Sequence, residues 1–366
     1  MSTSIAACRR ALHQIPETGW EVSKTAAYLR QVLEKLPCTV FSPVGEAVCA
    51  YFDFGRRETA AFRSDMDALP VTEQTGLPFT STHPGKMHAC GHDGHMAMLL
   101  GFAEALAARQ EAPCNVLLIF EPAEESTGGA QRICDTGLLE KYYVNRVYGL
   151  HLWPGLPQGT VASHAGGMMS RSCELTVEVF GESAHIAQWR QAKDALSVAS
   201  EFLQEAYALA EELPCLLRFG KLLSGEARNS VSKYSRLEGT LRCFDDALYA
   251  RLSVGLEALA AKLSQKTGCR ITTLCSSGYP PVTNDEGLLA EARRRFAVAE
   301  TEPTYITEDF SVYQQYVPGV FFFLGTGDTP PLHAPDFNFD EAVLERGPAL
   351  FEALLSAALW LSVNGA

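Results

Sequence analysis

The sequence predicts an α/β protein in which a doubly wound domain is interrupted by a smaller inserted α+β domain. Helix-like and strand-like stretches alternate over residues 1–167, a pattern typical of doubly wound sheets. Half-exposed alternating strands dominate residues 168–278, and buried-strand and helix patterns return over 279–366. We therefore expect one discontinuous domain, formed by 1–167 and 279–366, and an inserted domain over 168–278. A chain of 366 residues has room for both.

The first domain begins with helical periodicity and continues with apolar runs that end in polar residues. Such runs predict buried strands, and ligands of a doubly wound sheet bind beyond the carboxyl ends of its strands. The polar residues that follow the runs are therefore the first candidates for a site. In this part of the chain we expect helices at 4–14, 22–35 and 94–110, and strands at 47–54, 59–69, 115–125 and 144–152.

The inserted domain combines strands of period two with two helical stretches, and a β-α-β-β-α-β order would form a small α+β sandwich. The strand at 173–181 has the character of an exposed edge, which proteins cover or pair, and this predicts a homodimer through the inserted domain. The other expected elements are strands at 235–244 and 270–277 and helices at 193–212 and 246–267. The chain then returns to the first domain with a helix at 284–298, a strand at 319–325 and a closing helix at 340–363.

Charge and composition exclude several classes of partner. The chain has 30 basic and 43 acidic residues, which give a formal net charge of −13, and its longest basic run is the three arginines 293–295. Nucleic acids and anionic membranes bind clustered lysine and arginine, so neither is expected as a partner. No apolar run approaches the length of a membrane span, and the N-terminal residues do not resemble a signal peptide.

The eleven cysteines indicate a reduced protein. They are scattered, odd in number and without a CxxC pair, in a large chain that has no secretion signal. We therefore expect a cytoplasmic protein in which most cysteines are small core residues. Cys90 is set apart by the residues around it.

The stretch MHACGHDGH, residues 87–95, holds three of the nine histidines and a cysteine. Cys90 and His92 cannot share one face of a helix, but a loop entering a helix could direct both at one metal ion. A buried free cysteine beside a helix-capping histidine explains these two residues equally well. His88 and His95 fit structural histidines better than metal ligands.

Three further segments place polar residues after apolar runs. The segment EPAEE, residues 121–125, has adjacent glutamates that would normally lie on a solvated turn; if a metal neutralises one, the other could act as a general base. His151 ends an apolar run, and His333 lies on a proline-rich loop. Considered singly, His151 is best interpreted as a core histidine and the loop of His333 as a solvated turn. With Cys90 and His92 they form the ligand inventory of a two-metal site.

Several motifs together resemble a known family. RSDMDALPV, MHACGHDGH, EPAEE, GLHLWPGLPQGTV, EDF and LHAPDFNFDE follow one another across nearly the whole chain. The set closely resembles the metal-dependent amidohydrolase branch of the aminoacylase/carboxypeptidase family, which includes N-acyl-amino-acid, hippurate, auxin-conjugate and N-acetyldiaminopimelate amidohydrolases. The resemblance implies a two-metal catalytic domain with an inserted dimerisation lid.

The resemblance also implies a role for each motif residue of the first domain. Cys90 would bridge two divalent ions, zinc or manganese, with cobalt or nickel as further options. Glu124 would be the general base, and Asp65 would orient a ligand or fix the active-site loop without binding metal. The other metal ligands would be His92, Glu125, His151 and His333.

In the lid, the resemblance implies that His185 polarises the scissile carbonyl. Asn229 and Arg242 would approach the carboxylate or carbonyl of the substrate; an asparagine in a turn and an arginine on a strand surface are the plain alternatives. The chain departs from the family pattern after His185, where Trp189 replaces a proline and Arg190 replaces a histidine. The substrate choice of relatives therefore does not carry over directly.

The implied reaction is hydrolysis of the amide bond of an N-acyl amino acid, in the simplest case an N-acetyl amino acid, to a carboxylate and a free amino acid. Alternatives within the class are a dedicated N-acetyl-L,L-diaminopimelate deacetylase of lysine biosynthesis and a dipeptidase or carboxypeptidase, although the latter branches usually carry aspartate at the position of Cys90. A binding protein with a silent site would be expected to lack a ligand or the base. A hydrolase using Cys90 as nucleophile would leave both glutamates without a role.

Overall fold

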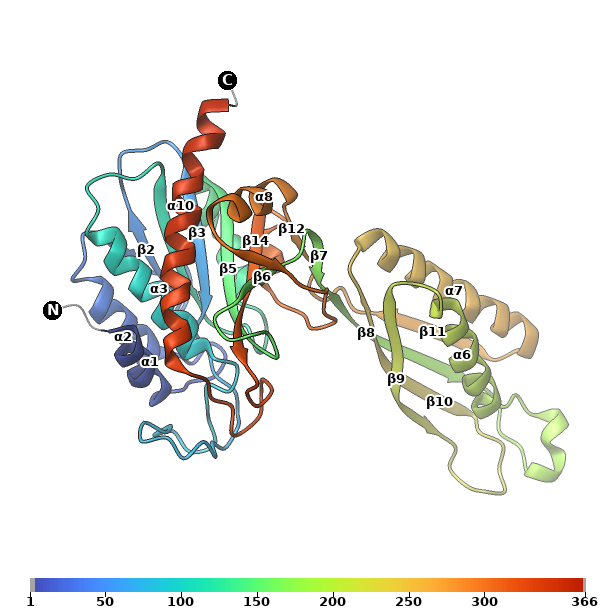
Figure 1. Cartoon of the computed structure of the whole chain (residues 1–366). Coiled ribbons are helices and arrows are strands. Elements are labelled where there is room, and N and C mark those ends of the chain that lie inside the picture. Colours follow the sequence, from blue (N-terminus) through green and yellow to red (C-terminus); the bar gives the residue numbers. More distant parts are fainter. Residues whose placement is uncertain (1–3, 365–366) are drawn as a thin grey trace. The chain divides into compact units, whose positions relative to one another are not determined.

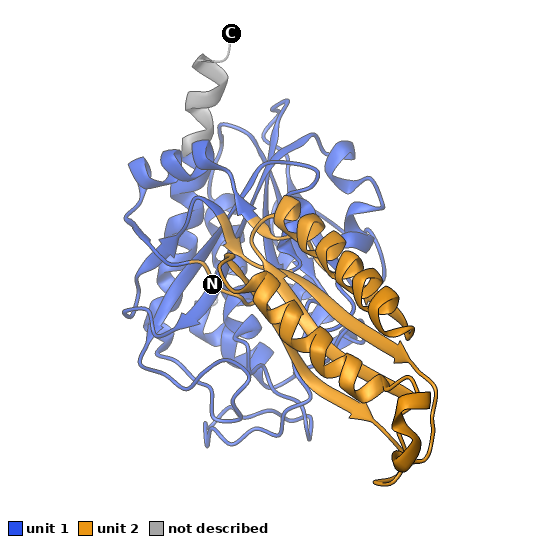
Figure 2. Cartoon of the chain, turned by 90° about the vertical axis from the view of Figure 1, so that its right-hand side faces the viewer, with its two compact units in different colours: residues 1–166, 283–302, 309–366 blue, residues 167–282, 303–308 orange. Residues whose placement is uncertain are grey.

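The computed structural model describes residues 4–364 and the side chains of residues 4–356. The chain forms two compact units (Figure 2). Unit 1 comprises residues 1–166, 283–302 and 309–366, and unit 2 comprises residues 167–282 and 303–308.

The division differs from the expected one by a few residues at the ends of the insert, 167 and 279–282, and at residues 303–308; we placed all of these in the first domain. Residues 303–308 are the larger departure. Their backbone is joined to unit 2, because Thr304 forms a β-bridge with Met169 and Arg242 donates a hydrogen bond to the Tyr305 carbonyl at 2.6 Å. Sequence periodicity does not reveal such a short pairing.

Unit 1 is built around an eight-stranded mixed sheet whose central strands are parallel (Figure 1). Strand β3 pairs in parallel with β4 and β5, and β14 pairs in parallel with β5. Across the sheet the order is β1-β2-β4-β3-β5-β14-β6-β13. The strands are β1 (Thr39–Phe41), β2 (Val48–Phe52), β3 (Thr59–Asp65), β4 (Asn115–Glu121), β5 (Val144–Pro154), β6 (Val161–Ser163), β13 (Val298–Glu300) and β14 (Gly319–Gly327).

The central strands are buried on both faces. Every residue of β3 and β4 is buried, as expected for parallel strands in the middle of a covered sheet. The register places Asp65, the last residue of β3, opposite Glu121, the last residue of β4. The polar residues that end these strands therefore lie side by side at the carboxyl ends of the parallel strands, where ligands bind in folds of this class.

The main helices of unit 1 pack around α3. Helix α3 (His92–Ala107) contacts β3, and α1 (Ile5–His13) and α10 (Arg346–Asn364) contact α3. Phe62 of β3 packs edge-on against Phe102 of α3 and Phe351 of α10. This confirms the predicted α/β class, although the closing helix expected at 340–363 begins as a separate 3₁₀ turn. The remaining helices are α2 (Ser23–Leu33), α4 (Ala130–Cys134), α5 (Leu138–Lys141), α8 (Glu286–Arg295), α9 (Phe310–Tyr313) and the 3₁₀ helix η2 (Glu341–Glu345).

Unit 2 is a four-stranded antiparallel sheet with helices α6 and α7 packed against it (Figure 1). Its elements follow the predicted β-α-β-β-α-β order, and the α+β class of the insert is confirmed. They are β8 (Arg171–Phe180), α6 (Ala195–Ala210), β9 (Cys215–Ser224), β10 (Tyr234–Cys243), α7 (Asp246–Thr267) and β11 (Arg270–Cys275).

Strand β8 is not an edge strand, so that expectation was wrong. It pairs with β10 on one side and with β11 on the other. The alternation in its sequence shows that one face is buried and the other exposed, and it carries no information about neighbouring strands. The edges of this sheet are β9 and β11, and β9 had not been assigned from the sequence.

Two short strands lie where the chain passes from one unit to the other, β7 (Gly166–Met169) and β12 (Val282–Asn284). Among the helices that the structure describes, none combines the length and the apolar character that a membrane span requires.

Candidate metal centre

The loop before α3 directs Cys90 and His92 toward one point. Gly91, between them, has φ +85°, a left-handed conformation that glycine adopts without steric cost. A Cβ atom on Gly91 would also lie 2.9 Å from Cδ1 of Leu152. Glycine therefore lets the chain turn sharply into α3, with Cys90 just before the turn and His92 as the first residue of the helix.

His92 presents one bare ring nitrogen. Its Nδ1–H donates a hydrogen bond to the Asp67 carbonyl at 2.8 Å. Its Nε2 is buried, has no hydrogen-bond partner among the described residues, and lies 3.8 Å from Oε1 of Glu125. A histidine with one nitrogen fixed by a hydrogen bond and the other free of donors is arranged as metal-binding histidines are.

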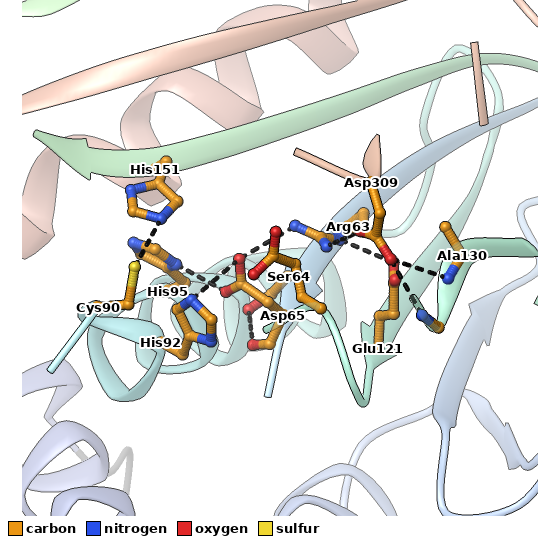
Figure 3. Close-up of polar contacts among 12 residues, drawn as sticks. Arg63, Ser64, Asp65, Cys90, His92, His95, Glu121, Ala130, His151 and Asp309 are labelled. Carbon is orange, nitrogen blue, oxygen red and sulfur yellow. Dashed lines mark hydrogen bonds and ion pairs between the residues drawn. The ribbon is translucent and has the colours of Figure 1, made fainter. Parts of the chain in front are cut away.

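His151, on β5, is oriented in the same way (Figure 3). Its Nδ1–H donates to the Leu152 carbonyl at 2.7 Å, and its Nε2 lies 3.4 Å from Sγ of Cys90. Zinc binds sulfur at about 2.3 Å and imidazole nitrogen at about 2.0–2.1 Å. One ion could therefore contact both atoms.

Glu125 and His333 complete the cluster. Nε2 of His333 lies 3.2 Å from Oε1 of Glu125, and donor atoms of Cys90, His92 and Glu125 all lie within 4.8 Å of one another. The structure thus brings the five residues expected as ligands together in unit 1. His333 has φ +68°, a conformation that residues other than glycine rarely adopt.

The electrostatics of this cluster favour a bound cation. Burial, followed by the charges of Glu125 and Glu124, raises the pKa of the Cys90 thiol well above its ordinary value. A buried thiol beside carboxylates can ionise only if positive charge is supplied, and a divalent ion supplies it. The residues therefore fit the expected metals. The raised pKa also disfavours Cys90 as a free nucleophile, because the thiolate is the reactive form.

Asp65 and His95 lie next to the candidate ligands and form hydrogen bonds that fix the backbone and side chains around them. Oδ1 of Asp65 accepts a hydrogen bond from Nδ1–H of His95 at 2.7 Å, and Nε2 of His95 accepts the Leu152 N–H at 2.9 Å. Both nitrogens of His95 are therefore engaged, which gives this histidine the structural role that we expected. His88 is also buried, and burial lowers its pKa to about 3.

Asp67 was missed in the sequence analysis. Its Oδ1 accepts the backbone N–H of Glu124 at 3.0 Å, and its Oδ2 accepts that of Glu125 at 3.3 Å. Burial, then the charges of Glu125 and Asp65, raises the pKa of Asp67 well above its ordinary value. Asp67 fixes the turn that carries both glutamates, and its place two residues after Asp65 was the available signal.

Arg63 is a second missed residue (Figure 3). Its buried guanidinium contacts Oδ2 of Asp65 at 3.0 Å, Oε2 of Glu121 at 2.8 Å and Oδ1 of Asp309 at 2.7 Å. Oδ2 of Asp309 in turn accepts the backbone N–H of Ala130 at 3.2 Å. Arg63 thus ties the ends of β3 and β4 to the segment that follows EPAEE. An arginine inside an apolar strand was the signal for it.

Glu124 lies beside Glu125 on a strained turn. The preceding residue, Ala123, has φ +67°, which is rare for a residue with a side chain. A pocket of about 280 Å³ opens next to Glu125, with Thr18, Leu69 and Ser126 among its lining residues. The residues that line this pocket include the acidic Asp67 and Glu125 and no basic residue. The pocket therefore suits a neutral or cationic part of a ligand.

The three candidate residues of the lid lie in unit 2. His185 precedes the 3₁₀ helix η1 (Ile186–Gln191), and the Asn229 carbonyl accepts the N–H of Ile186 at 3.0 Å, so His185 and Asn229 are neighbours. Arg242 lies on β10, apart from this pair, and donates to a backbone carbonyl.

The two departures from the family pattern lie on η1. Trp189 is 58% exposed, and the guanidinium carbon of Arg190 is 4.9 Å from the centre of its ring. They stack on each other at the surface of unit 2.

Comparisons with known proteins agree with the site. Residues 61–357 match the family described as peptidase family M20/M25/M40. The chain is 35% identical to an N-acetyldiaminopimelate deacetylase of Streptococcus uberis, over 96% of this chain and 98% of that protein. It is 34% identical to an N-acetyldiaminopimelate deacetylase of Leuconostoc citreum, over 96% and 95% of the two chains.

A solved structure is similar over the same length. A dinuclear metal-binding peptidase of the M20 family from Bacillus subtilis has a TM-score of 0.88 and 28% identity, over 97% of this chain and 98% of that one. The resemblance noted in the motifs is thereby confirmed for the family, and with it the expectation of a metal-dependent hydrolase. The chain belongs to peptidase family M20/M25/M40.

Proposed function

We propose that the protein is a metal-dependent amidohydrolase that cleaves the amide bond of an N-acyl amino acid, with an N-acetyl group as the preferred acyl group. The observation that carries the proposal is the cluster of five metal-binding side chains at one sheet edge with Glu124 beside it. The deacetylases named among the relatives support N-acetyl-L,L-diaminopimelate as the first substrate to test.

In this proposal each ligand has a defined task. Cys90 would serve as a ligand to both of two divalent ions, and His92, Glu125, His151 and His333 would be the other ligands. Such ions would supply polarisation of the amide carbonyl and a lowered pKa of water. Zinc suits the thiolate donor, and manganese, cobalt or nickel would be accepted by the histidines and the carboxylate.

Proton transfer falls to Glu124. It is not needed as a ligand, so its carboxylate can accept a proton from the attacking water and return it to the leaving nitrogen. Asp67 holds the turn through the backbone N–H groups of Glu124 and Glu125, which keeps the base in register with the ligand. In the lid, His185 would donate a hydrogen bond to the developing oxyanion, and Asn229 and Arg242 would each approach the carboxylate or the carbonyl of the substrate.

The test is a substrate panel assayed with each divalent metal. The panel contains N-acetyl-L,L-diaminopimelate, N-acetyl and N-benzoyl derivatives of neutral amino acids, and unblocked dipeptides. We expect metal-dependent release of free amino acid from the N-acetyl compounds, with the highest kcat/KM for the diaminopimelate derivative. Preferential cleavage of dipeptides would replace the proposal with a dipeptidase, and inactivity of the metal-loaded protein on every compound would favour a binding protein.

A reducing compartment is part of the proposal. All eleven cysteines are free in the described structure, and Cys90 must remain a thiolate donor to hold metal. We therefore assign the protein to the cytoplasm.

We further propose a homodimer formed through unit 2. Strand β9 is at an edge of its sheet and carries exposed leucines, with Leu222 39% and Leu223 52% exposed. Such an edge pairs readily with a second copy. Multi-angle light scattering at assay concentration should give twice the mass of 39.9 kDa calculated for one chain. A fully active species of single-chain mass would contradict this.

A further inference from the structure

A second group of buried charged residues lies beside the metal centre in unit 1, and none of its members is a proposed ligand. It consists of Arg9 and His13 of α1, Asp93 of α3 and Glu73 of the loop before α3; we call it the α1 cluster. Nε of Arg9 lies 3.2 Å and Nδ1 of His13 lies 2.8 Å from the same Oδ2 of Asp93. Nε2 of His13 lies 3.1 Å from Oε1 of Glu73.

Arg9 joins two segments that carry ligands. On one side its guanidinium binds Asp93, the residue after His92. On the other side its Nη2 donates to Oδ1 of Asn338 at 2.9 Å, and its guanidinium carbon lies 3.8 Å from the ring centre of Phe339. Asn338 and Phe339 belong to the loop that carries His333. One side chain, only 2% exposed, thus contacts both the first turn of α3 and the His333 loop.

The His333 loop needs such a restraint. With φ +68°, His333 adopts a backbone conformation that persists in a non-glycine residue only where surrounding contacts enforce it. Its own N–H donates to the Ala89 carbonyl at 2.8 Å, and the Pro335 carbonyl accepts the N–H of Gln74 at 2.7 Å. Gln74 is next to Glu73, which His13 holds. Two contacts of the loop that follows His333, at Pro335 and Asn338, therefore lead back to α1.

We propose that Arg9 is a positioning residue that holds His333 at the correct distance from Cys90 and His92, and so sets the affinity of the ion that His333 binds. The inference rests on the metal centre of the proposed function. A lysine would keep the charge, but it lacks the planar fork that reaches Asp93 and Asn338 in different directions. Loss of a partner that orients a ligand typically weakens metal binding by about 10–100-fold.

The experiment uses two variants and a matched control in the full chain. Arg9→Lys keeps the charge and removes the fork. Asn338→Ala removes the contact on the His333 side and leaves the buried pair of Arg9 and Asp93 in place. The control is Arg10→Met: Arg10 is the next residue of α1 and pairs with Glu341 at 2.5 Å. Glu341 also lies 3.4 Å from Nη1 of Arg9, so the control shows what the loss of a charge beside this carboxylate does by itself. The side chain of Arg10 is 54% exposed, and its polar contacts among the described residues include neither Asp93 nor Asn338.

Zinc affinity is measured by competition with a chelator in the absence of substrate, alongside thermal melting of the metal-free protein. We expect Arg9→Lys and Asn338→Ala to bind one of two ions about 10–100-fold more weakly and the other normally, with kcat reduced and KM retained. Arg10→Met should match the wild type in both affinities.

Wild-type affinity for both ions in the two variants would overturn the inference, and if Arg9→Lys fails to fold, Asn338→Ala decides alone. Equal weakening of both ions with a lowered melting temperature would also overturn it, because that result indicates general destabilisation. A wild-type protein that binds two ions but cleaves no N-acyl amino acid would remove the proposed substrate and leave this inference standing. A wild-type protein that takes up no metal would remove both.

Discussion

Replacing Glu124 by glutamine should leave the protein folded and loaded with metal but lower kcat by about 10²–10⁴-fold, the usual cost of removing a general base. Glutamine has nearly the shape of glutamate and cannot accept the proton. Because Asp67 binds the backbone N–H of residue 124, the turn itself should not move. The measurement is steady-state hydrolysis of an N-acetyl amino acid together with elemental analysis of the same preparation.

Glu125→Ala is the matched comparison on the same turn. Oε1 of Glu125 faces Nε2 of both His92 and His333, so this change should reduce metal content as well as turnover. The two neighbouring glutamates would then have different roles: Glu124 would transfer protons, and Glu125 would bind metal. Retention of metal and of activity in both variants would contradict the assignment of each.

Replacing Cys90 by alanine should have the second large effect, a fall from two bound ions per chain to at most one. The thiol sulfur lies 3.4 Å from Nε2 of His151, and it belongs to the same group of possible ligand atoms as His92 and Glu125. A bridging thiolate would be a ligand of both ions, so its removal should weaken the binding of both. We expect hydrolysis to fall with the metal content.

The control for this substitution is Cys49→Ala. Cys49 is buried in β2 and belongs to none of the ligand groups among the described residues, so its replacement makes the same change in volume without touching the centre. Inductively coupled plasma analysis of dialysed protein gives the number of ions. If Cys90→Ala kept two ions and lost all turnover, a cysteine nucleophile would explain the result better than a bridging ligand.

The candidate ligands could be proposed from the sequence because their residue types are informative on their own. Cysteine, histidine and adjacent glutamates after apolar runs are uncommon, and the parallel strands of unit 1 bring the ends of such runs to one edge. The register of Asp65 and Glu121 shows how directly this works. Local chemistry and strand polarity singled out these candidates, and the family resemblance assigned a role to each.

The partners of the supporting residues could not be found in this way because they are distant in the chain. Arg9 reaches Asn338, and Arg63 reaches Asp309, through tertiary contacts that no local pattern records. The misplacement of β8 at a sheet edge has a related cause, because alternation reports which face of a strand is buried and says nothing of the strands beside it. Pairing across hundreds of residues is decided by packing.

The discontinuity of unit 1 has a consequence for the order of events during synthesis. Cys90, His92, Glu125 and His151 are made early, but His333 follows only after the whole of residues 167–282 has been added. At about 5–20 residues per second, translation separates His151 from His333 by several to tens of seconds. During that interval the set of candidate ligands lacks His333, while the segment that forms most of unit 2 is being completed. The full set of five side chains therefore exists only after the inserted segment has been synthesised.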